Sequence, residues 1–415
     1  MTADDARQIA NLRRLLDITR HMAATTDLDE LLRMIVDAAV EVLGCERATI
    51  FLFDPEQGEL YSRVATGLQT LRVPADRGIA GTAARLRTVV NVPDAYADPR
   101  FNPQIDRLTG FHTRNLLAVP LENLSGQLMG VLQALNKHSA HFTTNDEQLA
   151  QTLAAQAGVA LHRHALLQEF ARQQKIIRDL EIARQIQLAL LPKQNPQPPE
   201  YEIAAYNRSA DQTGGDCYDF LTLPDQRLAM LLADASGHGL PAALIMTQCR
   251  AALRALLSLT SNLTTLATTV NTLLAHDLTD GRFVTVFLGI LDPHQHRLDY
   301  LAAGQGPLLF ITGTAVEARP PANLPLAITN QATFATEHFD FAPGDLLALF
   351  TDGFYETLAP DGQQYGIERL AQLLHQQRHF PLDTLIRSLN EDIARFSHNA
   401  APADDLTALL VRRQR

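Results

Sequence analysis

Between Asn145 and Leu191 the chain contains no proline and only one glycine, Gly158, so the backbone has nothing that would break a helix there. This stretch predicts one long helix that carries the chain from an N-terminal domain to a C-terminal one. Pro192 ends the helix, and three further prolines within the next seven residues mark a linker. A chain of 415 residues is long enough for two or three domains. We expect an N-terminal helix, a first domain, a helical linker and a second domain at residues 1–26, 27–162, 163–198 and 199–415, respectively.

The long helix has an incomplete heptad pattern. Thr144 and Glu147 form a capping box at its start. Apolar residues recur at heptad-compatible positions, namely Leu166, Phe170, Ile177, Leu180 and Leu191. Three polar residues interrupt the same stripe, namely Gln173, Arg184 and Gln187. Such a helix either lies on the surface of one subunit or forms a parallel coiled coil between two subunits. We favour the coiled coil, which predicts a homodimer.

Residues before the long helix alternate between helical and strand patterns. A short helix is expected at residues 4–22, and Asp27 with Glu30 forms a capping box that starts a second helix, which Gly44 ends. The pattern then changes to short apolar runs, which predict strands at residues 48–53, 58–65, 89–92, 116–121 and 127–135. The expected architecture is a single sheet covered by helices, in an α+β multidomain protein.

The C-terminal domain carries acids at the ends of four predicted strands, namely Asp216, Asp234, Asp352 and Asp404. Residues 227–232 predict a buried strand entered from a turn, so Asp216 and Asp234 lie at the ends of one hairpin. Any one of these acids alone is more often a turn residue. Four carboxylates presented together by rigid strands repel one another unless cations lie among them, and hard divalent ions prefer oxygen ligands. The pattern predicts a magnesium or manganese site.

Composition excludes several other classes. A net charge of −11 argues against nucleic acid as a partner, because binding a phosphate backbone needs a basic surface. The cysteines at 45, 217 and 249 are scattered, which predicts buried thiols in a reducing compartment and neither a disulfide framework nor a zinc site. We find no basic and apolar leader and no apolar run of the roughly 18 residues that span a bilayer. A cytoplasmic protein without a membrane span is expected.

Residues 27–162 resemble a GAF domain, a sensor module for small molecules. The matching segments are Gly78-Ile79-Ala80-Gly81, Asn91-Val92-Pro93-Asp94-Ala95, Asp98-Pro99-Arg100-Phe101 and Leu117-Ala118-Val119-Pro120-Leu121. A more specific match, resembling the signature of members that bind cyclic nucleotides, consists of Asn136-Lys137, Phe142 and Asp146-Glu147. The resemblance implies an antiparallel sheet with flanking helices, in which Lys137 pairs with Asp146. The implied ligand is a small molecule such as a cyclic nucleotide; the alternative is a domain that only dimerises.

Residues 176–415 resemble the metal-dependent protein phosphatases (PPM family) of the bacterial branch named for SpoIIE and RsbU. The matching segments surround the four acids and include an entrance segment, at residues 214–220, 233–239, 351–353, 404–405 and 185–192. The resemblance implies an α-β-β-α sandwich with two Mn²⁺ or Mg²⁺ ions in a cleft at one end of the sheets. Two departures, Gln305 where many relatives have histidine and Ala327 where glycine is usual, do not involve an implied metal ligand.

This resemblance also implies a role for each acid. Asp234 bridges both ions, Asp216 and the backbone carbonyl of Ala235 complete one ion, and Asp352 and Asp404 hold the other. Two ions placed in this way activate a water for in-line attack on phosphorus and offset charge on the phosphoryl oxygens. No cysteine nucleophile is required.

Three other residues near the acids have open roles. His238 invites interpretation as a general acid, but a loop residue beside the cleft is the interpretation we favour. Asp219 and Asp405 are candidates for supporting the metal ligands because they are close to them in sequence.

Two classes of function compete at this point. The first is a serine/threonine protein phosphatase that acts on a phosphorylated partner, by resemblance an anti-anti-sigma (STAS-type) protein, under control of the sensor. The second is a non-catalytic signalling module that binds ligand and partner without turnover. All four acids are retained, which favours the enzyme, because a binding module has no need for mutually repelling carboxylates.

Overall fold

The computed structural model describes residues 16–22, 24–63, 71–279, 281–313 and 315–414, which form two compact units. One unit extends to Gln174 and the other begins at Lys175. Residues 16–22 are helical, and the remainder of the expected helix at residues 4–22 lies outside the described residues.

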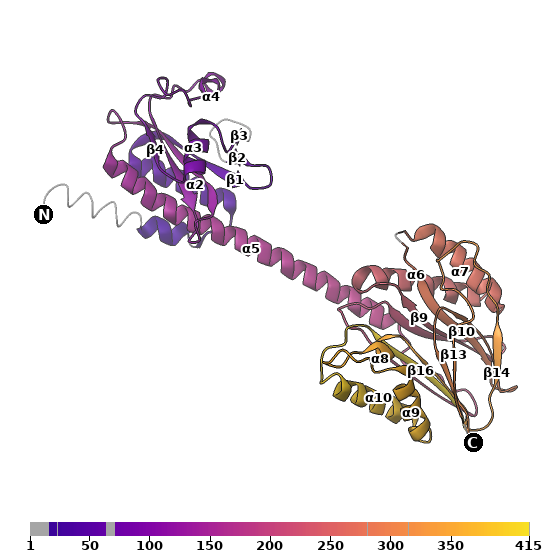
Figure 1. Cartoon of the computed structure of the whole chain (residues 1–415). Coiled ribbons are helices and arrows are strands. Elements are labelled where there is room, and N and C mark those ends of the chain that lie inside the picture. Colours follow the sequence, from indigo (N-terminus) through magenta and orange to yellow (C-terminus); the bar gives the residue numbers. More distant parts are fainter. Residues whose placement is uncertain (1–15, 23, 64–70, 280, 314, 415) are drawn as a thin grey trace. The chain divides into compact units, whose positions relative to one another are not determined.

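The N-terminal unit is built around one antiparallel sheet. Its elements are α2 (Leu28–Leu43), β1 (Cys45–Asp54), β2 (Glu59–Tyr61), β3 (Arg72–Pro74), α3 (Gly78–Leu86), β4 (Val90–Val92), α4 (Pro103–Thr109), β5 (Leu116–Glu122), β6 (Leu128–Lys137) and α5 (Thr144–Leu190). The six strands follow the order β3-β2-β1-β6-β5-β4 (Figure 1). Helix α2 and the first part of α5 cover one face, and α3 packs against the other. The expected sheet with flanking helices is confirmed.

Helix caps define the ends of the two longest helices in this unit. Asp27 caps α2 by accepting a hydrogen bond from the Glu30 N–H at 2.9 Å, and Gly44 ends it with a φ of 56°. At α5 the predicted capping box is displaced by one residue. The Thr143 hydroxyl accepts from the Asp146 N–H, and the Asp146 carboxylate accepts from the Thr143 N–H at 2.8 Å. Asp146 therefore performs the capping role that the sequence pattern assigned to Glu147.

The C-terminal unit contains the end of α5 and two five-stranded antiparallel sheets. Its remaining elements are β7 (Tyr201–Arg208), β8 (Asp216–Thr222), β9 (Leu228–Ala235), α6 (Gly239–Leu257), α7 (Leu263–Asp277), β10 (Val284–Asp292), β11 (Arg297–Ala303), β12 (Leu308–Ile311), β13 (Val316–Arg319), β14 (Glu337–Asp340), β15 (Leu346–Phe350), α8 (Gly353–Glu356), α9 (Ile367–Gln377), α10 (Leu382–Phe396) and β16 (Leu406–Arg413). The strand orders are β14-β11-β10-β9-β8 and β13-β12-β15-β16-β7.

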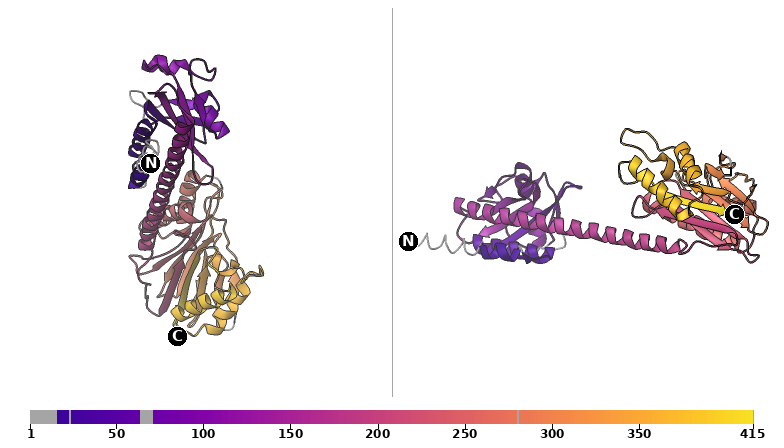
Figure 2. Two further views of the ribbon diagram at one scale, coloured as in Figure 1. Left: turned by 90° about the vertical axis from the view of Figure 1, so that its left-hand side faces the viewer. Right: turned by 90° about the horizontal axis from the view of Figure 1, so that it is seen from below.

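Three apolar layers hold these sheets and helices together. The middle layer lies between the sheets and contains Phe287, Tyr300 and Phe310, all fully buried. Helices α6 and α7 pack on the outer face of the first sheet, and α9 and α10, gold and yellow in Figure 2, pack on the outer face of the second. At about 25 cal/mol per Å² of apolar surface buried, such layers dominate the stability of the sandwich. The predicted α-β-β-α sandwich is confirmed.

One helix of the described residues, α6, has the length and apolar composition of a membrane span. Its side chains Ala242, Met246, Cys249 and Leu253 are buried against the first sheet together with α7. Its apolar character is therefore explained by its position in the core.

Candidate active site

The strands β8 and β9 place the first two acids side by side. Asp216, the first residue of β8, lies directly opposite Asp234 of β9 in the antiparallel register. The N–H of Ala235 donates to the carbonyl of Gly215 at 3.1 Å, which holds this end of the hairpin closed. Asp216 is buried and Asp234 is half-buried. The hairpin that the sequence predicted thus brings these two carboxylates together.

The other two acids come from the second sheet. Asp352 follows β15 by two residues, and Asp404 precedes β16, which pairs with β15. Thr351 links the two sheets, because its hydroxyl donates to Oδ2 of Asp216 at 2.7 Å. The same hydroxyl accepts from the N–H of Thr407 at 3.0 Å. The sequence reasoning missed Thr351, although its position directly before Asp352 was a signal.

The carboxylates interact strongly enough to shift one another's pKa. Burial raises the pKa of Asp234 to about 7, and the charges of Asp352 and Asp404 contribute to the rise. Burial also raises the pKa of Asp352 to about 6, with a further contribution from Asp404. The pKa of Asp216 lies well above its usual range because the side chain is buried and faces Asp234. Each of these groups would be stabilised in its charged form by a nearby cation.

The arrangement of the acids is open. Among the described residues, no group of three or more Asp, Glu, His or Cys side chains already has the arrangement of a metal-binding site. Mutual repulsion between carboxylates favours such an open arrangement. The chemistry of the donors still fits divalent ions, since the acids supply hard oxygens at the ends of two rigid sheets.

Glycines beside the acids allow the backbone to approach closely. A Cβ on Gly215 would lie 2.8 Å from the carbonyl oxygen of Ala235 and 3.4 Å from Oδ1 of Asp234. A Cβ on Gly353, the residue after Asp352, would overlap the carbonyl oxygen of Asp405. A side chain at Gly215 would therefore crowd the Ala235 carbonyl and the Asp234 carboxylate, and one at Gly353 would collide with the backbone that follows Asp404.

Asp405 supports the site through the backbone. Its Oδ1 accepts from the N–H of Ala210 at 2.8 Å, and its Oδ2 accepts from the N–H of Asp216 at 3.3 Å. These bonds tie the loop before β8 to the start of β16, and burial raises the pKa of Asp405. The suggestion that Asp405 supports the acids agrees with these contacts.

Asp219 does not belong to this group of acids. Its carboxylate pairs with Arg250 at 2.9 Å and with Arg254 at 2.7 Å, both on α6. Side chains alternate between the faces of a strand, so Asp216 and Asp219, three residues apart, point to opposite faces of β8. The proximity argument for Asp219 was therefore wrong.

His238 lies on the surface of the loop before α6. Its side chain is 85% exposed, and Nδ1 lies 3.0 Å from Oδ2 of Asp211. This position agrees with a loop residue.

The end of α5 is hydrogen-bonded to the backbone next to the acids. The Gln187 amide accepts from the N–H of Gly214 at 3.1 Å and donates to the carbonyl of the same residue. Gly214 is two residues before Asp216, and Leu191 packs against both cores that the first sheet borders. Gln187 interrupts the heptad pattern, and these bonds show that it instead holds the end of α5 to the backbone of Gly214.

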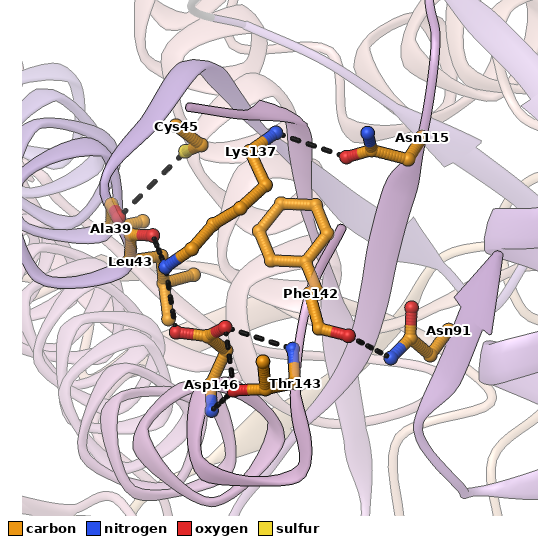
Figure 3. Close-up of polar contacts among 9 residues, drawn as sticks. All are labelled: Ala39, Leu43, Cys45, Asn91, Asn115, Lys137, Phe142, Thr143 and Asp146. Atoms are coloured by element: carbon orange, nitrogen blue, oxygen red, sulfur yellow. Dashed lines mark hydrogen bonds and ion pairs between the residues drawn. The ribbon is translucent and has the colours of Figure 1, made fainter. Parts of the chain in front are cut away.

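In the N-terminal unit, the predicted pairing of Lys137 with Asp146 is confirmed (Figure 3). The Lys137 Nζ lies 2.8 Å from Oδ1 of Asp146 and donates to the carbonyl of Leu43 at 2.6 Å. Asn91 donates to the carbonyl of Phe142 and to the Glu147 carboxylate. These contacts join β6, α2 and the start of α5, so the signature is structural.

The N-terminal unit also encloses a cavity of about 370 Å³ between the sheet, α3 and α4. Most lining side chains are apolar or aromatic, including Phe51, Ile79 and Phe101. The guanidinium of Arg47, at the cavity wall, lies 4.3 Å from the centre of the Phe111 ring. Ser62 lines the cavity, is 1% exposed, and its hydroxyl has no hydrogen-bond partner in the described part of the chain. A buried hydroxyl without a partner is costly, so it is suited to bind a polar atom of a ligand.

Comparisons with known proteins identify both units. Residues 27–161 match the GAF domain family, and residues 224–414 match the family of stage II sporulation protein E (SpoIIE). The SiaA-PP2C domain of Pseudomonas aeruginosa has the same fold, with a TM-score of 0.53 and 23% identity over 58% of this chain and 98% of that one.

Two curated relatives are much longer proteins. A probable 3',5'-cyclic phosphodiesterase of Caenorhabditis elegans (pde-5) is 29% identical over 184 residues, 41% of this chain and 25% of its own length. The dual 3',5'-cyclic-AMP and -GMP phosphodiesterase 11A of Takifugu rubripes is 43% identical over 93 residues, 22% of this chain and 10% of its own length. This chain thus spans a quarter or less of these relatives. The two family matches, together with the α-β-β-α sandwich, show that this chain joins a GAF domain to a SpoIIE-type (PP2C) domain.

Proposed function

We propose that this protein is a metal-dependent protein serine/threonine phosphatase regulated by its GAF domain. The observation that carries the proposal is the gathering of Asp216, Asp234 and Asp352 at the ends of the two sheets, where burial and mutual repulsion raise their pKa. A protein that does not bind cations there has no evident reason to hold these charges together.

The chain's own residues would hold two Mn²⁺ or Mg²⁺ ions as the family resemblance implies. Asp234 would bridge both ions, Asp216 and the Ala235 carbonyl would bind one, and Asp352 and Asp404 would bind the other. Ions held there supply Lewis-acid chemistry that activates water and stabilises charge on a phosphoryl group. Thr351 orients Asp216, and Asp405 fixes the loop before it.

The substrate we propose is a phosphoprotein, specifically an anti-anti-sigma protein of the STAS type. The match to the SpoIIE family supports this choice. Asp404 is exposed, so the acids lie at a surface that a phosphorylated segment of another protein can reach.

For the GAF cavity we propose a small ligand of the cyclic-nucleotide class. Its aromatic walls suit a purine ring, Arg47 suits a phosphate, and the Ser62 hydroxyl suits a polar atom of the ligand. Both curated relatives are named as cyclic-nucleotide phosphodiesterases. Titration calorimetry of the full chain with cyclic AMP and cyclic GMP tests this assignment; no heat of binding with either contradicts it and leaves a domain that only dimerises.

We also propose a cytoplasmic homodimer held by a coiled coil at residues 163–198, between a GAF domain at 27–162 and a phosphatase domain at 199–415. Helix α5 exposes apolar side chains along this stretch, namely Leu166, Leu167, Phe170, Ile176, Ile177, Ile182, Ile186 and Leu188. A second copy of the helix would cover part of this exposed apolar surface. The three cysteines are free and buried, consistent with a reducing compartment.

A phosphatase assay distinguishes the enzyme from a non-catalytic signalling module. The purified chain is incubated with a phosphoserine protein in Mn²⁺, and again after chelation of the metal. Phosphate release with Mn²⁺ and its loss on chelation support the proposal. Binding of the phosphoprotein without release in Mn²⁺ favours the non-catalytic module.

A further inference from the structure

Gln305 lies in the segment that carries the chain from the first sheet to the second. It follows β11 and precedes β12, and its side chain is buried with 3% exposure. Both ends of the side-chain amide are hydrogen-bonded. Oε1 accepts from the hydroxyl of Thr285 on β10 at 3.0 Å, and Nε2 donates to the carbonyl of Phe350 on β15 at 2.8 Å. The amide therefore connects one sheet to the other.

Both partners of Gln305 are next to acids of the candidate site. Thr285 lies directly opposite Asp234 in the register of β9 and β10. Phe350 is the last residue of β15 and precedes Thr351, which binds Asp216, and Asp352. Gln305 thus connects β10, the neighbour of the strand that carries Asp234, to the end of β15, two residues before Asp352.

We propose that Gln305 is a positioning residue that sets the separation of Asp234 and Asp352, and with it the affinity of the site for Mn²⁺ or Mg²⁺. This inference rests on the proposed metal-dependent function and adds the residue that holds the two halves of the ion site in register. Groups that orient metal ligands change affinity by roughly 10- to 100-fold when they are lost. An apolar side chain at position 305 would leave only packing, and no hydrogen bond through this side chain, between β10 and β15.

Two variants separate the hydrogen bonds of Gln305 from its volume. Gln305→Met keeps an unbranched chain of similar length and removes both bonds. Gln305→His keeps one donor and one acceptor in a neutral ring, and so can still accept from Thr285 and donate to the Phe350 carbonyl.

Asn271 provides a matched control in the same domain. It is fully buried on α7, donates to the carbonyl of Thr329 at 2.9 Å and accepts from the N–H of Ala327 at 2.8 Å. Asn271→Leu therefore removes one donated and one accepted bond, as Gln305→Met does, but at a place where the partners are not neighbours of the acids.

The experiment is calorimetric titration of Mn²⁺ into the full-length chain and its variants, with thermal unfolding measured in parallel. We expect Gln305→Met and Asn271→Leu to lower the unfolding temperature by similar amounts. Only Gln305→Met should weaken Mn²⁺ binding, by at least about tenfold, and Gln305→His should recover most of the affinity.

Three results would overturn the inference. Wild-type Mn²⁺ affinity in Gln305→Met rejects it while leaving the proposed phosphatase function intact. An equal loss of affinity in Asn271→Leu shows a general effect of lost stability. Absence of Mn²⁺ binding in the wild-type chain contradicts both this inference and the proposed function.

Discussion

At the scale of single residues, the buried pair of Lys137 and Asp146 links pH to the stability of the GAF domain. Burial alone would raise the pKa of Asp146, but the bonds from Lys137 and Thr143 outweigh burial and lower it. An acid whose pKa is lowered by folding stabilises the folded state above its unfolded pKa, which is about 4. That contribution is lost as the pH falls from about 4 through the lowered value.

Lys137→Met should destabilise the GAF domain by about 3 kcal/mol at pH 7, because it leaves a buried carboxylate without its cation. The deficit should shrink as the pH falls from about 4 through the lowered pKa of Asp146, since the carboxylate is then progressively protonated. Urea unfolding at pH 7 and at a pH below about 4 measures both effects. The control is Arg63→Met, which breaks the exposed pair with Asp29 and should change little. An equal deficit at both pH values would contradict this account of the pair.

Gly353→Ala should disturb the acids of the second sheet. The added Cβ meets the carbonyl oxygen of Asp405, which is backbone and cannot rotate away, so Asp404 and Asp352 must move apart. We expect a loss of about 1–3 kcal/mol in unfolding free energy and a higher Mn²⁺ requirement for phosphatase activity. Gly313→Ala is the control, because no atom of the described residues other than its chain neighbours lies within 4 Å of a Cβ placed there. Equal Mn²⁺ requirements in the two variants would refute this role of Gly353.

The acids were accessible to sequence reasoning, whereas their supports were not. Asp216 and Asp234 could be paired because a turn followed by a buried apolar run defines a hairpin. Thr351 and Gln305 act through hydrogen bonds between two sheets. The place of Thr351 directly before Asp352 was a signal, but spacing along the chain does not show which groups on the other sheet these two side chains bind. The prediction that Asp219 supports the metal ligands was wrong for a related reason, since closeness in sequence does not reveal which face of a strand a side chain occupies.

At the scale of elements, long or strongly patterned segments were predictable and short ones were not. The strands expected at residues 48–53 and 116–121 are present as β1 (Cys45–Asp54) and β5 (Leu116–Glu122), with ends shifted by at most three residues. Strands β12 to β14 have four residues each, too short to show a period, and they were missed. Helix α3 was missed because it is only nine residues long and contains Gly78 and Gly81, and glycine has a low helix propensity.

Helix α5 is the element that connects the GAF domain to the SpoIIE-type domain. Inserting one residue near Arg172 turns the helix beyond it by about 100°, whereas inserting seven nearly restores its facing. We expect the rotational position of α5 to act on Asp216 through Gln187 and Gly214. The one-residue insertion should then change basal phosphatase activity several-fold, and the seven-residue insertion should change it much less. Phosphate release by the two insertion variants measures this. Unchanged activity in both would exclude control by helix phase.

At the scale of the whole molecule, a sensor ligand can change catalysis only if it binds two states of the protein with different affinity. The proposed ligand site is the GAF cavity, and α5 is a continuous helix from Thr144 to Leu190 whose end is hydrogen-bonded to Gly214, two residues before Asp216. The sign of the regulation follows from which state the ligand prefers. This account of regulation depends on whether the acids at the sheet ends perform metal-dependent catalysis.

Asp234→Asn tests that claim most directly, since it removes the charge proposed to bridge both ions and keeps the shape of the side chain. The measurement is the rate of phosphate release from a phosphoserine protein at saturating Mn²⁺, with thermal unfolding as the check on folding. We predict a fall of at least about 1,000-fold with little change in unfolding temperature, because the partner of this acid is an ion and not the core. Asp216→Ala should be partly restored by higher Mn²⁺. Near wild-type phosphate release by folded Asp234→Asn would contradict the assignment of the site.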